Sequence, residues 1–258
     1  MAADRTLVAE LRLVRGDFTL EVSLSAPPGI TVLFGPSGAG KSTTLAAVAG
    51  LLRPDSGRIT VDGEVWFDSR AGVDRPVHDR GLAFVFQSLA LFPHMTALEN
   101  VEYGIDRATP RDERRRRAAA MLERMKVAHV GARRPSTFSG GEAQRVALAR
   151  AFARAPRLVL LDEPFTALDR ELRRELCADV RATVLDLGVP TVLVTHQRRE
   201  ARMLGDRAVI LSGGRTRAAG SVDQVLAEMG RWPPPGEDEL GSLAPGARSD
   251  AAGEEAER

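Results

Sequence analysis

The chain has 258 residues, of which 43% are hydrophobic and 28% are charged, and its formal net charge is +1. This length and composition allow one substantial hydrophobic core and are ordinary for a soluble globular protein. The small net charge excludes the strong basic field on which most nucleic-acid-binding proteins depend. A single cysteine, Cys177, excludes an internal disulfide and a thiolate metal site and fits a reducing cytoplasm. No apolar run reaches the roughly 18 residues that cross a bilayer, and the charged N-terminus has no signal-peptide core.

The N-terminal part of the chain predicts strands separated by turns. Residues 7–24 alternate apolar and polar side chains well enough for two strands around a turn at residues 15–17, and Pro27-Pro28-Gly29 ends the pair. Ile30–Phe34 is a nearly continuous apolar run, as expected of a buried parallel strand. A helix is predicted from Lys41 to about Leu52, so the intervening glycine-rich residues connect a strand to a helix.

The middle of the chain changes from strand to helix. Arg58–Phe67 predicts a strand pair hinged at Asp62-Gly63, and Leu82–Phe86 predicts a second buried strand. From Leu91 to about Ala155 the pattern is helical, most clearly at Arg111–Val127. We therefore predict a helical subdomain at about residues 91–155.

Strands and helices alternate again in the C-terminal part. The predicted strands are Leu158–Asp162, Thr191–Thr195 and Ala208–Leu211, and the predicted helices lie near residues 170–187 and 200–204. This alternation predicts a parallel α/β sheet within one domain over residues 1–230. Residues 231–258 are expected to be a disordered tail, because from Pro233 they contain seven acidic residues against two arginines and almost no large apolar residues.

A phosphate-binding loop is the first motif that carries chemistry. Gly35-Pro36-Ser37-Gly38-Ala39-Gly40-Lys41-Ser42 has the spacing G-x-x-x-x-G-K-S and lies between a predicted strand and a predicted helix. Its backbone N–H groups and the positive helix end would surround the phosphates. Lys41 would contact the β- and γ-phosphates, and Ser42 would give a hydroxyl to Mg²⁺. A chance glycine-rich turn is the alternative, and the strand–loop–helix order counts against it.

Two carboxylates follow another predicted strand. Asp162 and Glu163 end the apolar run Leu158–Asp162, which places them at the carboxyl edge of a parallel sheet, where ligands of open α/β folds bind. Asp162 would hold Mg²⁺, directly or through water, and Glu163 would polarise a water that attacks the γ-phosphate. An isolated pair of this kind is as well explained by two solvated carboxylates, so the prediction depends on the phosphate loop.

With the segment Phe138-Ser139-Gly140-Gly141-Glu142-Ala143-Gln144-Arg145, the sequence resembles the ATP-binding-cassette (ABC) ATPases. The resemblance implies a P-loop NTPase (RecA-like) parallel-sheet core with an N-terminal antiparallel β subdomain and an inserted helical subdomain. It also implies a head-to-tail homodimer in which the turn Ser139-Gly140-Gly141 caps the ATP held by the other copy. The turn is also a good helix N-cap. Phe138 and Glu142 stand where leucine and glutamine are usual in the family, and Glu142 could alter the electrostatics of the closed pair.

The resemblance assigns roles to further single residues, each of which would be unremarkable alone. Gln87 matches the family's Q-loop position, His196 matches the switch histidine that contacts the γ-phosphate, and Asp169 matches the D-loop at the subunit contact. Phe18 could stack on adenine, or it could be a core phenylalanine. The expected catalytic residues are Lys41, Gln87, Glu163 and His196, and the expected Mg²⁺ ligands are Ser42, Gln87 and Asp162. The expected ATP-binding residues are Gly35, Pro36, Ser37, Gly38, Ala39, Gly40, Lys41, Ser42, Thr43, Phe18, Ser139, Gly140, Gly141 and Asp169.

Within this family, Leu91–Val101 looks like the segment of bacterial importer ATPases that contacts the permease, and Phe92-Pro93-His94 is most similar to molybdate-type oxyanion importers. The resemblance implies an importer ATPase at the cytoplasmic face of the membrane, bound to a transmembrane permease and used with a substrate-binding protein. Such relatives usually have a further β-rich regulatory domain, where this sequence has the acidic tail. The transported ion does not meet this subunit in such systems.

Three alternatives stay open. The chain could serve an exporter, it could be a soluble ABC ATPase that acts on nucleic acid or ribosomes, or it could be an inactive regulatory cassette. The run Arg114–Arg117 would favour nucleic acid, but Asp112 and Glu113 precede it and no aromatic residues are interleaved, so a solvated helix face is the better interpretation. We expect no nucleic-acid partner. Intact motif residues count against an inactive cassette.

Overall fold

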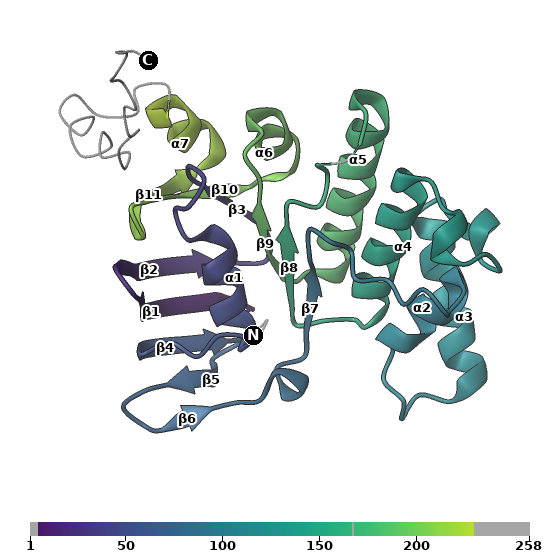
Figure 1. Cartoon of the computed structure of the whole chain (residues 1–258), viewed down its shortest axis with the longest axis horizontal. Helices are drawn as coiled ribbons and strands as arrows, with labels where there is room; N and C mark the ends of the chain where they lie inside the picture. Colours follow the sequence, from purple (N-terminus) through teal and green to yellow (C-terminus); the bar gives the residue numbers. More distant parts are fainter. Residues whose placement is uncertain (1–4, 167, 230–258) are drawn as a thin grey trace, which may run out of the picture.

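A computed structural model of the chain describes residues 5–166 and 168–229 (Figure 1). The predicted tail lies outside the described residues. Within them, all strands belong to one sheet with the order β6-β5-β4-β1-β2-β11-β10-β3-β9-β8-β7. The strands are β1 (Leu7–Arg15), β2 (Phe18–Ala26), β3 (Gly29–Phe34), β4 (Ser56–Val61), β5 (Glu64–Asp68), β6 (Val73–Asp74), β7 (Leu82–Val85), β8 (Leu158–Asp162), β9 (Pro190–Val194), β10 (Arg207–Ser212) and β11 (Arg215–Ser221). The α-helices are α1 (Lys41–Ala49), α2 (Ala97–Gly104), α3 (Arg111–Arg124), α4 (Gly140–Ala153), α5 (Arg170–Leu187), α6 (Arg198–Leu204) and α7 (Val222–Met229).

The sheet is mixed, with an antiparallel half and a parallel half. Strands β6, β5, β4, β1 and β2 pair antiparallel, whereas β10, β3, β9, β8 and β7 pair parallel. The halves join where β11 turns back antiparallel to β10 and pairs with β2 at Arg215 and Glu21. The antiparallel strands and the parallel core expected from the sequence therefore share one continuous sheet.

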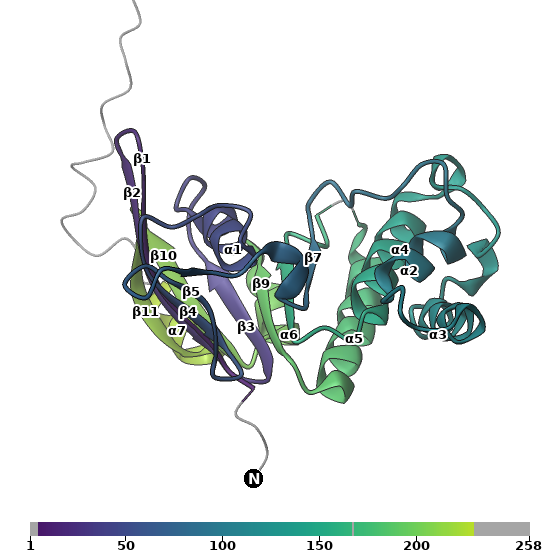
Figure 2. The same cartoon turned by 90° about the horizontal axis from the view of Figure 1, so that it is seen from below.

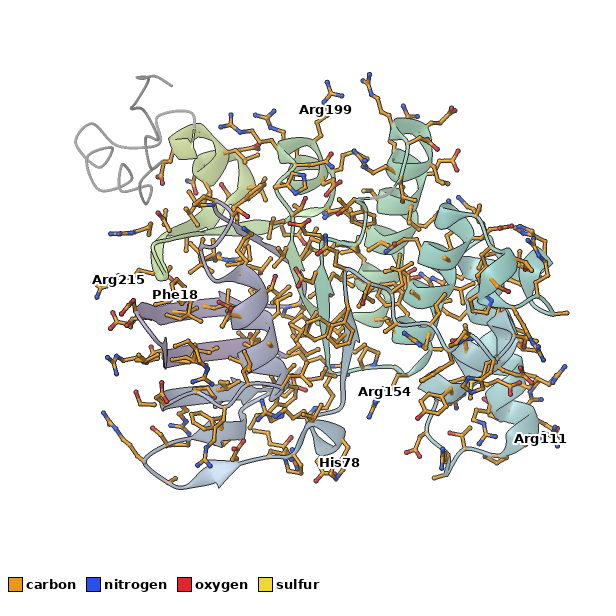
Figure 3. All side chains as sticks on the ribbon, in the orientation of Figure 1. Phe18, His78, Arg111, Arg154, Arg199 and Arg215 are labelled. Atoms are coloured by element: carbon orange, nitrogen blue, oxygen red, sulfur yellow. The ribbon has the colours of Figure 1, made fainter. Side chains whose placement is uncertain are left out.

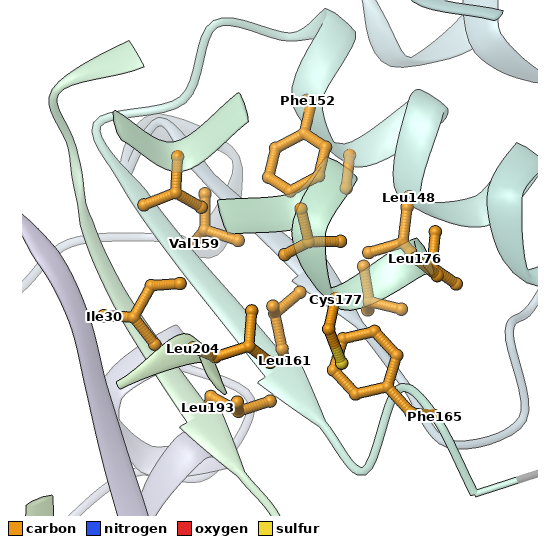
Figure 4. Close-up of a cluster of buried hydrophobic side chains, with 14 of the residues drawn as sticks. Ile30, Leu148, Phe152, Val159, Leu161, Phe165, Leu176, Cys177, Leu193 and Leu204 are labelled. Atoms are coloured by element: carbon orange, nitrogen blue, oxygen red, sulfur yellow. The ribbon is translucent and has the colours of Figure 1, made fainter. Parts of the chain in front are cut away.

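Alternating side chains of the parallel strands pack into two buried clusters on opposite faces of the sheet. In β8, Leu158 and Leu160 face the cluster formed with α1 and the antiparallel strands. Val159 and Leu161 face the other cluster, which contains residues of α4 and α5. Figure 4 shows this second cluster, where Phe152 of α4 lies beside the β8 side chains. These four residues of β8 are fully buried, because both faces of the strand are covered. Burial on both faces explains why the parallel strands are continuous apolar runs.

The helices α2, α3 and α4 form a lobe at one end of the molecule, beyond β7 and α5 (Figures 1 and 2). They occupy residues 97–153, inside the range where the sequence predicts a helical subdomain. Capping explains where two of them begin: Thr96 and Ser139 each accept a hydrogen bond from the backbone N–H three residues on, and a glutamate at that third position bonds back.

Some predicted boundaries and elements were wrong. The helix expected to reach about Leu52 ends at Ala49, because Gly50 adopts a left-handed backbone conformation and its N–H closes the last turn. The strand β11 and the helix α7 were not predicted at all. In β11 no side chain of Arg215–Ser221 is buried, so the strand lacks the apolar pattern that identifies its neighbours. Among the described residues, no helix combines the length and the apolar character needed to cross a bilayer.

Candidate functional site

The loop between β3 and α1 has a backbone that only glycine accommodates. Gly40 has a φ of +96°, and a Cβ there would lie 2.5 Å from Leu20 Cδ1 and 3.1 Å from Phe18 Cζ. A larger residue would be strained and would clash with the β2 side chains. The absence of a side chain at Gly40 therefore lets the loop pack closely against Phe18, the first residue of β2. Figure 3 labels Phe18 beside this strand.

Lys41 is folded back into the phosphate loop. Its ammonium donates hydrogen bonds to the carbonyl oxygens of Gly35 (2.9 Å) and Pro36 (2.8 Å), and the residue is 9% exposed. Burial lowers the pKa of this amine below its ordinary value, and the carboxylates of Glu163 and Asp162 oppose that shift. The loop thus holds a cation whose donors could be transferred to phosphate oxygens.

Ser42 connects the loop to the end of β8. Its hydroxyl donates to Asp162 Oδ1 over 3.2 Å, although 120 residues separate the two in the sequence. Burial and the neighbouring Glu163 raise the pKa of Asp162, whereas the Ser42 hydrogen bond and Lys41 lower it, and burial is the largest effect. A hydroxyl and a half-buried carboxylate therefore lie side by side at the edge of the sheet.

Glu163 is held in an uncommon backbone conformation one residue further on. It has a φ of +47°, and its N–H donates to the carbonyl of Val194, the last residue of β9. The Oε1 of Glu163 lies 3.5 Å from Nδ1 of His196, and the Thr166 hydroxyl donates to the backbone carbonyl oxygen of Glu163 over 2.9 Å. A residue other than glycine is strained in this left-handed backbone conformation, so the surrounding structure must stabilise it. Such strained residues are concentrated at functional sites.

Lys41, Ser42 and Glu163 border one pocket of about 490 Å³. It is lined by Phe18, Ser37, Gly38, Gly40, Lys41, Ser42, Thr43, Gln87 and Glu163. The structure thus brings together the glycine-rich loop, the aromatic ring considered for the base, the predicted Q-loop glutamine and a carboxylate. Other predicted site residues do not line the pocket. The carbonyl oxygens of Gly35 and Pro36 accept hydrogen bonds from Lys41, and Ala39 is buried. Asp162 contacts Ser42, and His196 contacts Glu163.

The turn at Ser139 is capped by residues of its own lobe. Ser139 Oγ accepts from the backbone N–H of Glu142 over 3.2 Å, and Glu142 Oε2 accepts from the Ser139 N–H over 2.7 Å. The other oxygen of Glu142 lies 3.1 Å from His129 Nε2 and 3.3 Å from Arg133. The Ser139 backbone hydrogen bond is the main cause that lowers the pKa of Glu142. Glu142, noted in the sequence as a departure, therefore completes a capping box.

The Ser139 turn does not border the pocket that the phosphate loop lines. It begins α4 in the helical lobe, and Gly141 lies against α5: a Cβ there would be 2.4 Å from Leu172 Cδ2. Asp169 caps α5 close by, accepting from the backbone N–H groups of Glu171 (3.0 Å) and Leu172 (2.9 Å). The predicted site residues consequently fall into two groups, one around the phosphate loop and one around the starts of α4 and α5.

Arg150 is a further residue at this site that sequence reasoning missed. From α4 it donates to the carbonyl oxygens of Leu89 (2.9 Å) and Ala90 (2.7 Å), and its guanidinium lies 5.3 Å from the Phe92 ring centre. Leu89 and Ala90 both have positive φ angles, so one side chain holds two strained residues that follow Gln87 and Ser88. Nothing local indicates this contact, because 60 residues separate Arg150 from Ala90.

The strand–loop–helix arrangement and the carboxylates at the sheet edge define a P-loop nucleotide-binding fold. A model of the ABC transporter family matches residues 20–166, more than half of the chain. The chain therefore belongs to the ABC transporter family.

Individual known proteins agree with this assignment. The chain is 40% identical over 234 residues to the molybdenum import ATP-binding protein ModC of Paramagnetospirillum magneticum, covering 91% of this chain and 64% of the relative. It is 44% identical over 224 residues to ModC of Albidiferax ferrireducens, covering 86% of this chain and 60% of the relative. The chain thus spans less than two thirds of the length of these relatives.

Solved structures show the same arrangement. The dimeric structure of MJ0796, a bacterial ABC transporter cassette, superposes with a TM-score of 0.71 at 28% identity, covering 84% of this chain and 98% of that one. The cbiO1 protein of Clostridium perfringens, part of the cbiONQ ABC transporter complex, superposes with a TM-score of 0.76 at 27% identity, covering 88% of this chain and 92% of that one.

Proposed function

We propose that this chain is the ATP-binding and ATP-hydrolysing subunit of a bacterial ABC importer, and that it energises the uptake of molybdate or a related oxyanion through a separate permease. The observation that carries the ATPase part is the pocket in which Lys41, Ser42 and Glu163 meet at the carboxyl edge of the sheet. The importer part and the oxyanion rest on the similarity to ModC proteins, whose name describes molybdenum import.

The residues of the pocket suit phosphoryl transfer to water. Lys41 would exchange its contacts with the Gly35 and Pro36 carbonyls for contacts with the phosphates. Glu163 would accept a proton from the attacking water, and His196, 3.5 Å from it, would contact the γ-phosphate. Phe18 would stack on the adenine ring at the rim of the pocket.

The donor set fits Mg²⁺. Magnesium in nucleotide sites prefers oxygen ligands and is held by one or two protein groups together with substrate phosphates. The Ser42 hydroxyl and the Asp162 carboxylate are neighbouring oxygens, 3.2 Å apart, and Gln87 lines the same pocket. These three residues would hold the ion, which would neutralise charge on the phosphates.

A second copy would complete the site. Ser139, Gly140 and Gly141 are remote from the pocket of their own chain, whereas their backbone donors at the start of α4 suit a phosphate. We propose a head-to-tail homodimer in which each turn caps the nucleotide of the other copy and Asp169 lies at the contact. The dimeric MJ0796 cassette supports this arrangement.

The permease would bind on the helical lobe. A groove of about 490 Å³ borders the segment Leu91–Val101 and is lined by His94, Met95, Glu99, Glu102, Tyr103, Ile105, Arg107 and Arg114. Tyr103 is 53% exposed and packs edge-on against Phe92. Exposed aromatic surface beside charged side chains is typical of a protein contact. The protein would thus lie at the cytoplasmic face of the membrane, and a substrate-binding protein would serve the complete system.

The Glu163→Gln variant tests the hydrolytic assignment. We expect it to bind ATP, to dimerise with ATP, and to hydrolyse ATP about 10² to 10⁴ times more slowly, because it lacks the general base. Phosphate release, nucleotide binding and gel filtration with ATP measure the three properties. The control Glu123→Gln, on the exposed face of α3, should hydrolyse ATP normally. Equal hydrolysis by the Glu163→Gln variant would remove Glu163 from the proposed role.

Purification from native membranes tests the transport assignment. We expect the wild-type chain to retain a multi-spanning permease and the Tyr103→Ala variant to lose it. The control Leu185→Ala removes a side chain of α5 with similar exposure, 55%, and should retain the permease. Recovery of ribosomes or DNA in place of a permease would overturn the proposed function, and a permease without a substrate-binding-protein partner would favour an exporter.

A further inference from the structure

A second cleft lies between the first turns of α5 and the helix α6, outside the nucleotide pocket. It has a volume of about 430 Å³ and is lined by Arg170, Arg173, Arg174, Cys177, Gln197, Arg199, Glu200, Arg202 and Met203. Five of these residues are arginines from two separate elements, whereas only one is a carboxylate. This cleft is therefore strongly positive in a chain whose net charge is +1.

Four of the five arginines have no partner among the described residues. Arg173 donates to the carbonyl of Phe165 over 3.2 Å and to Gln197 Oε1 over 2.7 Å, so its donors are used. In residues 5–166 and 168–229, the side chains of the other four form no hydrogen bond or ion pair; they are Arg170, Arg174, Arg199 and Arg202. Like charges placed together around one cleft repel one another, and an anion would relieve that repulsion.

Besides its arginines, the cleft is lined by two apolar residues and a buried acid. Cys177 is buried, with 1% exposure, and Met203 lies at the surface, with 39% exposure. Glu200 is 3% exposed, and its Oε1 accepts no hydrogen bond within the described part of the chain, although Arg173 lies 3.5 Å away. Glu200 and Arg173 thus balance each other, which leaves the charge of the rim arginines uncompensated.

We propose that this cleft binds a run of carboxylates followed by an apolar side chain, and that its occupant is Glu237-Asp238-Glu239-Leu240 of the same chain. Arginine forks match carboxylates in two-point hydrogen bonds, and the aliphatic arginine stems with Met203 offer a surface for a leucine. The segment has three consecutive acids next to Leu240, and its charge is opposite to that of the rim.

The path of the chain makes this contact feasible. In both Figure 1 and Figure 2, α7, α6 and α5 lie in a row, and the description of the chain ends with α7, which contacts α6. Arg199 points outward from α6 in Figure 3. Eight residue steps separate Met229 from Glu237, and an extended chain of that length spans about 25 Å, more than the width of two packed helices, about 20 Å.

An occupant of the cleft would lie against Gln197 in the loop that follows β9, and Arg173 would connect it to the loop that follows β8. Arg173 bonds Gln197, the residue next to His196, and the carbonyl of Leu168, the residue before Asp169. Binding of the acidic segment would therefore affect the positions of Asp169 and His196 through Arg173. The inference goes beyond the proposed function, and its tests below use no nucleotide, so either can fail without the other.

Disulfide trapping in the full-length chain tests the contact directly. The native thiol of Cys177 does not compete, because burial raises its pKa to about 12 and keeps it unreactive. We expect the pair Met203→Cys and Leu240→Cys to cross-link within one chain at least about tenfold faster than Met203→Cys with Ala252→Cys, in low salt. The advantage should vanish at about 0.5 M salt, where charges are screened beyond a few ångströms.

Charge variants separate the proposed occupant from others. Changing Glu237, Asp238 and Glu239 to their amides should abolish the fast cross-link, whereas the same change at Asp250, Glu254 and Glu255 removes three charges and should preserve it. The double variant Arg199→Gln with Arg202→Gln should also abolish it. Equal rates for the two cysteine pairs, insensitivity to these charges, or a cross-link between two chains would overturn the proposal; the last would show that a second copy covers the cleft.

Discussion

The phosphate loop and the Ser139 turn are both proposed to contact nucleotide, yet their surroundings in the structure differ. Around the loop, groups from β2, from α1 and from the segments that follow β7 and β8 line one pocket, and Asp162 and His196 contact that lining. At the turn, Ser139 and Glu142 bond each other at the beginning of α4, and Glu142 also contacts His129 and Arg133 of the same lobe. The loop lies beside the hydroxyl and carboxylates of its own chain, whereas the contacts of the turn stabilise the start of its own helix.

Under the proposed head-to-tail arrangement, this difference means that one chain would form only half of a hydrolytic site at each location. A pocket that contains the cation, the hydroxyl and the carboxylates can bind nucleotide by itself. A capped helix start with free backbone donors can add to a phosphate only if a second molecule brings one to it. We therefore expect an isolated monomer to bind ATP and to hydrolyse very little of it.

The largest effect on ATP binding is expected at Lys41. Replacing it with alanine should weaken ATP binding about tenfold to hundredfold, since charge-assisted hydrogen bonds contribute about 1.5–3 kcal/mol each. Fluorescence titration with a labelled ATP measures the affinity. The control Lys126→Ala removes the chain's other lysine and should bind ATP normally. Unchanged affinity in the Lys41→Ala variant would mean that the loop pocket is not the nucleotide site.

Ser139→Ala should separate hydrolysis from binding. We expect hydrolysis to fall at least about tenfold while ATP affinity of the dilute protein is unchanged, and the lost cap to cost about 1 kcal/mol. The control Thr96→Ala removes the equivalent cap of α2, so it should cost the same stability without affecting hydrolysis. If the Ser139→Ala variant also lost ATP affinity at low concentration, the turn would act within its own chain and the contrast would be wrong.

Arg150 of the helical lobe bonds the segment that follows Gln87, so its loss should affect the nucleotide pocket from outside. Arg150→Leu frees the carbonyls of Leu89 and Ala90, so the backbone that positions Gln87 should relax. We expect hydrolysis to fall about severalfold and more Mg²⁺ to be needed for half-maximal rate, with metal-free ATP binding unchanged. The exposed neighbour Arg154, changed to leucine, is the control. An unaltered Mg²⁺ requirement would leave Arg150 a packing residue only.

We expect the buried carboxylate of Asp162 to destabilise the folded protein at neutral pH. Because burial raises its pKa above the ordinary 3.8, the folded protein binds the proton more tightly than the unfolded chain does. The stabilising contribution is present at pH values below 3.8 and is lost as the pH rises through the folded-state pKa. At neutral pH, Asp162→Asn should raise the Tm by about 2–4 °C, as about 1 kcal/mol does in a domain of this size.

The Asp162 measurement is a series of thermal unfolding curves between neutral and acid pH. The advantage of the Asp162→Asn variant should shrink as the pH falls, because the wild-type carboxyl becomes protonated and neutral as well. A variant that is less stable than the wild type at neutral pH would show that the Ser42 and Lys41 contacts outweigh the burial of the charge.

The smallest effect is expected on the exposed face of α3. Arg116 and Arg117 both pair with Glu113 at the surface, where such pairs contribute little. Changing both arginines to glutamine should shift the Tm by less than about 2 °C and leave the retention on a heparin or DNA column unaltered. A large loss of retention would revive the nucleic-acid interpretation of this run.

Local patterns were enough to locate the chemistry along the chain. The G-x-x-x-x-G-K-S spacing, the apolar run ending in Asp162-Glu163 and the Ser139 turn with its third-position glutamate all depend on residues a few positions apart. The strand β3, the helix α5 and the β1–β2 hairpin also followed from local pattern and appear in the structure. Short-range hydrogen bonding and side-chain periodicity are encoded locally, which is why these predictions were possible.

Long-range contacts were not available from such patterns. The sequence contains no sign that Arg150 holds the carbonyls of Leu89 and Ala90, or that β11 crosses to β2 and unites the two halves of the sheet. The arginines of the α5–α6 cleft are spread over two helices and look like ordinary surface charge until the helices are placed side by side. Each of these depends on how distant segments pack.

By itself, the sequence determined which residue types are present at each strand end and each helix start, because spacing and local hydrogen bonding set those positions. Only the tertiary structure decided which of them meet. Parallel pairing of β3 with β9 and of β9 with β8 brings Ser42 to Asp162 and His196 to Glu163, across 120 and 33 residues of sequence. The same packing leaves the Ser139 turn on the other lobe, because sheet order and register depend on the burial of whole strands and not on any single motif.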